Sequence, residues 1–274
     1  MFLGLVQGIT EFLPVSSSGH LSILQNLFGL EYSEEGNLLF DVLLHLGTLI
    51  SICLVYRAEI KAMLSDGLEF LRMRGESDTD EPVVMKPPAR VLLFILIATI
   101  PMFITLFFSN SVERLFSNTG FIGFALLVTG GILFVSDKYV QKGNKTEKTI
   151  TLADALIIGL SQAVAILPGL SRSGTTISVG VSRGLNGTFA VRFSLLLSIP
   201  AVLGATVISL FKAIRNGVNF ALFPTYLLGF IIATVVGFFA IQLIRQLMKK
   251  GSFGKFAYYC WAVGALAIIL SIVL

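Results

Sequence analysis

The chain has 274 residues, of which 55% are hydrophobic and only 13% are charged. About a quarter of the residues of a soluble domain are charged, so this composition excludes an ordinary soluble protein and indicates an integral membrane protein built from helices. The sequence pI of about 9.1 is high enough for a nucleic-acid ligand. However, the Lys and Arg residues gather in loops between apolar segments, which is a signal of membrane topology, and we expect no nucleic acid to bind.

The chain opens with two short apolar pieces, residues 1–13 and roughly 17–30. Each is too short to cross a hydrocarbon core of about 30 Å, which needs about 20 helical residues. Pro14 and the run Ser16-Ser17-Ser18-Gly19 separate them. Irregular backbone at membrane depth is tolerated where it lines a cavity. We therefore expect a re-entrant pair of broken helices whose break faces the functional site.

Longer apolar segments follow, and the second half of the chain repeats the plan. A second broken pair is expected at about 152–168 and 172–183. Apolar residues at helical spacing in 60–71 predict an amphipathic helix on the membrane surface. We expect an all-α polytopic membrane protein with six full transmembrane spans and two re-entrant broken pairs, ten helices in all. The expected spans are 38–56, 90–109, 119–136, 189–211, 222–244 and 256–274.

One motif occurs in both halves at a constant offset. Gly4-Leu5-x-Gln7 followed by Ser16-x-Ser18-Gly19 returns as Gly159-Leu160-x-Gln162 followed by Ser171-x-Ser173-Gly174. Such a recurrence indicates a duplicated unit. Because each copy holds one of the two breaks, we expect the two broken loops to meet.

The duplication predicts how the whole chain is organised. We expect a single membrane domain over 1–274, with repeat one at about 1–136 and repeat two at about 152–274. Each repeat has an odd number of crossings, so the two copies must be inserted upside down relative to each other. The fold expected is therefore an inverted-topology repeat.

Basic residues predict the orientation in the membrane, because loops rich in Lys and Arg stay in the cytoplasm. In the orientation that separates the basic loop residues most unequally between the two sides of the membrane, only Arg114, Lys212 and Arg215 lie outside the cytoplasm. The cytoplasmic loops are then 57–90, 137–151, 183–192 and 245–255, with six, four, two and four basic residues.

The run from Pro168 to Thr176 is rich in hydroxyl groups, flanked by glycines, and carries one arginine, Arg172. An Arg near the bilayer centre costs roughly 2.5–3.5 kcal/mol on insertion scales, so it is kept where it faces a polar cavity and binds something. A Gly/Ser loop that leads into a helix N-terminus forms an anion nest, and a guanidinium matches phosphate. The alternative is an Arg that only ties down carbonyls of a broken helix. The predicted phosphate-binding residues are Ser16, Ser171, Arg172, Ser173, Gly174, Thr175 and Thr176.

Gln7 and Glu11 are four residues apart and share one helix face. An ionised Glu in an apolar helix is destabilising unless it is paired or bound to a metal. Hard oxygen ligands of this kind suit Mg²⁺ or Ca²⁺. The sequence therefore predicts a divalent metal at Glu11 and Gln7, with a Glu11–Arg172 ion pair without metal as the alternative.

The first broken loop also carries Ser17 and His20. A hydroxyl near an imidazole is the minimum for an activated nucleophile, whereas a Ser run alone in a helix break often only satisfies freed backbone groups. We expect Ser17 as nucleophile and His20 as base or acid, with His20 or an activated water as alternative nucleophiles. The second histidine, His45, lies one turn beyond Asp41, and a structural hydrogen bond is favoured there over the lining of a headgroup cavity.

The runs Gln7–His20 and Pro168–Thr176 together resemble the paired signature of bacterial undecaprenyl-diphosphatases of the bacitracin-resistance type. The likeness covers essentially the whole chain. It implies a membrane hydrolase that removes the terminal phosphate of undecaprenyl diphosphate and recycles the lipid carrier for cell-wall synthesis. It also implies catalytic roles for Ser17, His20, Glu11 and Arg172, and dependence on a divalent metal.

The same resemblance implies a setting. The protein is expected in the bacterial cell membrane with its active site on the periplasmic or extracellular side. Its expected partners are undecaprenyl diphosphate, the bilayer and a second copy in a homodimer, with bacitracin competing by sequestering the substrate.

Two features depart from the family pattern. The first motif position is Gln7 rather than Glu, which removes one negative charge from the metal site and predicts weaker metal binding. The sequence starts only six residues before Gln7, which is compatible with a shortened N-terminus. This apolar start also lacks the features of a cleaved signal peptide.

Two other functions were weighed against hydrolysis. Inverted repeats with broken helices are also a transporter plan, so a polyprenyl-phosphate transporter or flippase is the alternative, although a carrier needs no nucleophile. An acid-phosphatase-like lipid phosphatase is excluded, because that family needs a second His after its Ser-Arg and no His follows Arg172.

Overall fold

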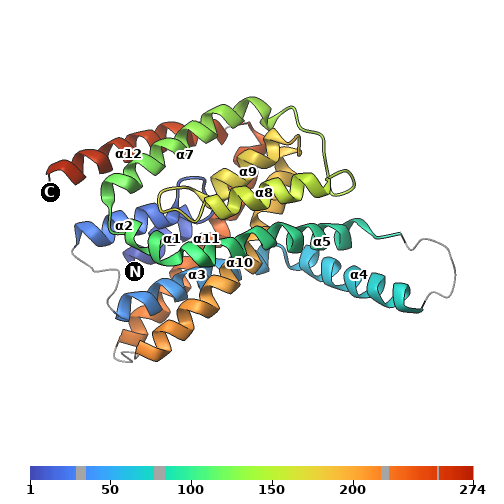
Figure 1. Ribbon diagram of the computed structural model, residues 1–274, viewed down its shortest axis with the longest axis horizontal. Helices are drawn as coiled ribbons and strands as arrows, with labels where there is room; N and C mark the ends of the chain where they lie inside the picture. The colour runs from blue at the N-terminus through green and yellow to red at the C-terminus, as the bar shows by residue number, and fades with distance from the viewer. Residues whose placement is uncertain (29–34, 77–83, 217–221, 252, 274) are drawn as a thin grey trace.

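The computed structural model describes residues 1–28, 35–76, 84–216, 222–251 and 253–273. This part of the chain consists of helices and their connections, with one isolated bridge between Lys145 and Leu185 (Figure 1). The prediction of an all-α polytopic membrane protein is confirmed. By length and composition, five of the described helices can cross a membrane, or six if one bent pair counts as a span.

The first half of the chain contains the first broken pair and the first three predicted spans. Its elements are α1 (Phe2–Thr10), α2 (Ser17–Leu27), α3 (Glu35–Val55), α4 (Arg57–Glu76), α5 (Pro87–Thr99), the 3₁₀ helix η1 (Ile100–Phe108), α6 (Ser109–Leu115) and α7 (Thr119–Val140).

The second half follows the same order without counterparts of α4 and α6. Its elements are α8 (Leu152–Val164), α9 (Arg172–Ser182), α10 (Gly187–Asn216), α11 (Phe223–Lys249), the short 3₁₀ helix η3 (Phe253–Lys255) and α12 (Phe256–Val273).

The expected number of ten helices is too low, because the described chain forms twelve α-helices. The helix expected over 60–71 is α4, which leaves α3 at a bend of 76°. The second addition is α6, which is separate because the span that begins with α5 passes through η1. Pro101 lies at the start of η1, and a proline removes one backbone N–H from the helix ladder.

Packing relates the two halves in matching ways. Helix α1 packs against α11, and α8 packs against α5 and η1. A Cβ atom at Gly4 would lie 2.7 Å from the Gly229 carbonyl oxygen, and one at Gly159 would lie 2.2 Å from the Ala98 carbonyl oxygen. These two glycines hold the same place in the repeated motif. They allow the same close backbone contact in both halves, as two units related by a two-fold axis require; the repeat boundaries stay a prediction.

The main apolar core lies next to the two breaks. Phe12, Phe193 and Ile177 are each at most 1% exposed within one large cluster. Phe12 stands between α1 and the first break, and Ile177 lies on the helix that follows the second. Figure 1 shows α7 and α12 side by side along one edge of the molecule, where they pack together. The core thus fixes both breaks at the centre of the fold.

We expect Gly159→Ala to destabilise the protein, because the added methyl group has no room beside the Ala98 carbonyl. Overpacking of this kind costs about 1–3 kcal/mol. Thermal unfolding in detergent measures the effect. Gly131→Ala is the matched control, because a Cβ atom at that α7 position meets nothing within 4 Å. Equal unfolding temperatures for the two variants would contradict the close helix contact.

Candidate active site

The two broken loops meet, as the repeated motif predicted. Ser16 Oγ donates to the Leu170 carbonyl across 3.5 Å, and Ser173 Oγ donates to the Leu13 carbonyl across 3.4 Å. Each loop therefore supplies a hydroxyl to a carbonyl of the other. Carbonyl groups freed by a helix break need such partners where water is excluded.

Both helices that follow the breaks start with a serine cap. Ser16 Oγ accepts from the Gly19 N–H at 3.2 Å, and Ser171 Oγ accepts from the Gly174 N–H at 3.0 Å. Serine is favoured at this position because its hydroxyl satisfies a free N–H of the first turn. Helices α2 and α9 thus begin at Ser17 and Arg172 and direct the positive ends of their dipoles towards the junction of the loops.

The backbone at the junction is held in unusual conformations. Ser16 has a φ of 69°, and among the described residues it is the only non-glycine residue with a positive φ. Such a conformation costs about 1–3 kcal/mol and persists only where surrounding contacts fix it. On the second loop, Thr129 Oγ1 from α7 donates to the Gly169 carbonyl at 3.0 Å and accepts from the Ser171 N–H at 3.1 Å.

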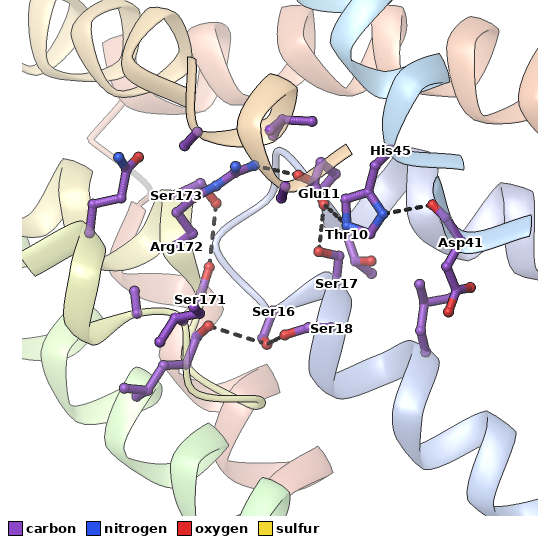
Figure 2. A pocket seen from close by; sticks show the side chains of 18 of the residues that line it. Thr10, Glu11, Ser16, Ser17, Ser18, Asp41, His45, Ser171, Arg172 and Ser173 are labelled. Atoms are coloured by element: carbon purple, nitrogen blue, oxygen red, sulfur yellow. Dashed lines mark hydrogen bonds and ion pairs between the residues drawn. The ribbon is translucent and has the colours of Figure 1, made fainter. Parts of the chain in front are cut away.

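A cavity of about 290 Å³ opens at this junction. Figure 2 shows hydroxyl, carboxylate and guanidinium groups of both halves converging on it. Its apolar lining residues come from α2, α3, η1, the residue after α6, the second broken loop and α10. The polar lining residues are Thr10, Glu11, Ser16, Ser17, Ser18, Ser22, Asp41, His45, Gln162, Ser171, Arg172, Ser173, Thr206 and Ser209.

Glu11 is the hub of the polar groups. Its Oε1 atom forms an ion pair with the Arg172 guanidinium, which joins the two halves of the chain. Its Oε2 atom accepts from Ser17 Oγ at 2.6 Å and from Gln7 Nε2 at 2.9 Å. The carboxylate is only 6% exposed. Its buried charge is therefore compensated by one cation and two neutral donors, as a buried charge requires.

His45 is a site residue that the sequence did not single out as catalytic. Its Nδ1–H donates to the Asp41 carbonyl at 2.8 Å, and its Nε2 atom lies 4.0 Å from Glu11 Oε2. Both His45 and Asp41 line the cavity. The favoured structural hydrogen bonds are present, since Asp41 also accepts from Gln25 on α2 at 3.3 Å, and the headgroup-cavity alternative fits as well. The only sequence signal was a second histidine one turn from an acid.

His20 is not among the described residues that line the cavity. Its Nδ1–H donates to the Ser16 carbonyl at 2.8 Å, and its Nε2 atom lies 2.8 Å from the Tyr259 hydroxyl on α12. Both ring nitrogens are thus engaged in contacts that hold the first loop. The ring faces Tyr259 on α12 and not the Ser17 hydroxyl that the sequence predicted as its partner.

The predicted phosphate-binding residues separate into two groups. Ser16, Ser171, Arg172 and Ser173 line the cavity. Gly174, Thr175 and Thr176 are buried behind it, and Thr176 Oγ1 bonds the Arg172 carbonyl at 2.8 Å. The second group packs α9 rather than reaching the cavity directly.

The predicted metal ligands are adjacent, but they form a small donor set. Gln7 is fully buried, and its Oε1 atom has no hydrogen-bond partner in the part of the chain that the structure describes. Glu11 adds a carboxylate. No group of three or more His, Cys, Asp and Glu residues that could hold an ion was found within the described ranges. Two protein oxygens suit Mg²⁺, which usually takes its other ligands from water and substrate phosphates.

Comparisons with known proteins identify the family of the chain. Residues 1–266 match the family described as bacitracin resistance protein BacA. The chain is 40% identical to an undecaprenyl-diphosphatase of Carboxydothermus hydrogenoformans, with 98% of this chain and 95% of that protein covered. It is 42% identical to one of Methanobrevibacter smithii (99% and 96% covered) and 41% identical to one of Desulforapulum autotrophicum (99% and 97% covered). The chain therefore belongs to the bacitracin resistance protein BacA family.

Proposed function

We propose that this protein is a membrane phosphatase that hydrolyses undecaprenyl diphosphate to undecaprenyl phosphate and inorganic phosphate. The relatives that share about two-fifths of its sequence over nearly full length carry the name of this activity. The observation that carries the proposal is the Ser17 hydroxyl, bonded to a buried carboxylate that is itself paired with Arg172. This arrangement places a nucleophile, a proton acceptor and an anion-binding group in one cavity.

The diphosphate binds where the N-termini of α2 and α9 meet. Free N–H groups and the dipoles of both helices favour an anion there. Ser16, Ser171 and Ser173 add hydroxyl donors, and Arg172 offers a guanidinium that is 23% exposed and can turn from Glu11 to a phosphate. The polyprenyl tail extends along the apolar wall formed by Met102, Phe116, Ala201, Val202 and Ala205.

Ser17 then attacks the terminal phosphorus. Its proton passes to Glu11 Oε2, the atom that already accepts its hydrogen bond at 2.6 Å. The bond from this phosphorus to the bridging oxygen breaks, and undecaprenyl phosphate leaves with that oxygen. Water hydrolyses the resulting phosphoserine, which releases inorganic phosphate and restores the Ser17 hydroxyl.

A divalent cation, Mg²⁺ or Ca²⁺, belongs to the proposal. Glu11, which lines the cavity, and Gln7, whose buried Oε1 atom has no partner among the described residues, would hold it. When bound, such an ion neutralises charge that develops on the transferring phosphoryl group. The absence of a carboxylate at position 7 predicts weak retention, so the ion would exchange readily with chelators.

The wider setting is also proposed. The described helices are those of a multi-pass membrane protein, and the family is described as bacitracin resistance protein BacA. We place the site on the periplasmic or extracellular side of a bacterial cell membrane. Competition by bacitracin for the substrate and formation of a homodimer complete the proposal as expectations from the family.

A polyprenyl-phosphate carrier is the second candidate function. The two breaks meeting at one cavity favour it, because transporters with inverted repeats bind substrates at such places. A carrier needs Arg172 and the helix N-termini but not the bond from Ser17 to Glu11. We therefore rank it below hydrolysis.

We expect purified protein in detergent to release inorganic phosphate from undecaprenyl diphosphate, and Arg172→Ala to slow release roughly 100–1000-fold, as for a lost transition-state donor. Ser17→Ala should abolish release. Ser198→Ala is the matched control, since Ser198 is buried, is bonded within α10 and is not among the residues that line the cavity. EDTA should lower the rate and added Mg²⁺ or Ca²⁺ restore it. Full turnover by Ser17→Ala would rule out the proposed nucleophile.

A second test concerns His20. If its ring positions the loop through Tyr259, Tyr259→Phe should lower kcat about five-fold, the value of one ordinary hydrogen bond, and His20→Ala should lower it further. If His20 is instead the base or acid of the reaction, Tyr259→Phe frees its Nε2 atom and should leave kcat unchanged or raised. We expect the first result, because both ring nitrogens are engaged. The measurement is phosphate release at saturating substrate.

A further inference from the structure

One buried side chain of the cavity is not used by the chemistry described above. Gln162 lies on α8, is 1% exposed and lines the cavity. Neither its Nε2 nor its Oε1 atom has a hydrogen-bond partner among the described residues. A buried amide without partners destabilises a fold, because it gives up its hydrogen bonds to water and gains none in return. Such a group at a cavity wall is suited to meeting a ligand.

The repeated motif shows how Gln162 came to be unpartnered. Its equivalent in the first half, Gln7, donates to Glu11 Oε2 at 2.9 Å, four residues further along the same helix. The residue four positions after Gln162 is Ile166, which offers no acceptor. The second copy thus keeps the amide and lacks the carboxylate. Ile166 also lines the cavity.

The surroundings of Gln162 define the ligand. Arg172, the loop hydroxyls and the N-termini of α2 and α9 converge on the cavity and favour an anion there. Arg172 also compensates Glu11, which with Asp41 is one of the two carboxylates in the lining. An amide contributes two N–H donors without a charge. In-line displacement puts the leaving oxygen on the side of the phosphorus away from the nucleophile. Ser17 comes from the first half of the chain, whereas Gln162 belongs to the part of the lining that the second half supplies.

We propose that Gln162 binds the substrate's lipid-linked phosphate, with its Nε2 group donating to an oxygen of the phosphate that leaves with the polyprenyl chain. This inference rests on the proposed function for the identity of the substrate. The anion contact itself rests only on the unpartnered amide in the cavity. Gln162 is therefore a substrate-binding residue supplied by the repeat that lacks the nucleophile.

The test replaces Gln162 with methionine, which has a similar length and no amide. We expect kcat/KM for undecaprenyl diphosphate to fall about 10- to 100-fold, as for the loss of a hydrogen bond to a charged group. We also expect the unfolding temperature of the ligand-free variant to stay the same or rise, because an unpartnered buried amide is removed. A residue that only supports the fold would give the opposite change in stability.

Tyr226→Phe is the matched control. It also removes a buried polar atom that has no partner among the described residues, but Tyr226 lies on α11 and does not line the cavity. We expect it to leave kcat/KM unchanged. A second variant, Gln162→Glu, should weaken binding more than Gln162→Met, because a carboxylate of nearly the same shape repels the phosphate.

A binding measurement separates this inference from the proposed function. Methylenediphosphonate, which is not hydrolysed at its P–C–P link, should raise the unfolding temperature of the wild-type protein more than that of Gln162→Met. If the wild-type protein releases no phosphate but shows this difference, the function is wrong and the anion contact stands. If the wild-type protein is active and Gln162→Met matches it in both assays, or does not fold, the inference is overturned.

Discussion

Backbone groups freed by a broken helix must find partners inside the membrane, and this constraint shapes the centre of the molecule. The two broken loops supply some of these partners to each other. Serine caps bind the first N–H groups of α2 and α9, hydroxyls of each loop reach carbonyls of the other, and Thr129 from α7 bridges the second loop. The price is a strained Ser16. The result is a junction where the remaining N–H groups and dipoles all favour an anion.

Charge balance at this junction depends on both halves of the chain. Glu11 comes from the first break and Arg172 from the second, and each is the other's counter-charge in a region where neither is stable alone. The Ser17 hydroxyl is held on the same carboxylate. The site is therefore complete only when both halves are folded together, since its one arginine, Arg172, comes from the second half and Ser17 and Glu11 come from the first.

Helix classes and the meeting of the loops could be predicted from sequence, because apolar length and a motif repeated at one offset are local signals. Side-chain direction could not. His20 and His45 each bond the carbonyl four residues earlier, yet one faces Tyr259 and the other faces Glu11, because distant packing sets how each helix is rotated. In the same way, the orientation of α9 buries Gly174, Thr175 and Thr176 behind the cavity. Pro101 could be read from the sequence, but the 3₁₀ helix η1 that begins beside it and separates α5 from α6 could not.

The Glu11–Arg172 ion pair also affects how anions bind and leave the cavity. The contact between Arg172 and Glu11 uses one terminal nitrogen of the guanidinium, and a phosphate competes with the carboxylate for that donor. The tethered carboxylate thus acts as a built-in competitor at high local concentration. An anion must bind more favourably than this carboxylate to displace it. Free phosphate makes few contacts and competes poorly, whereas a diphosphate makes more contacts and competes better. In the proposed reaction, the same carboxylate can bind the guanidinium again after hydrolysis and so favour release of the product.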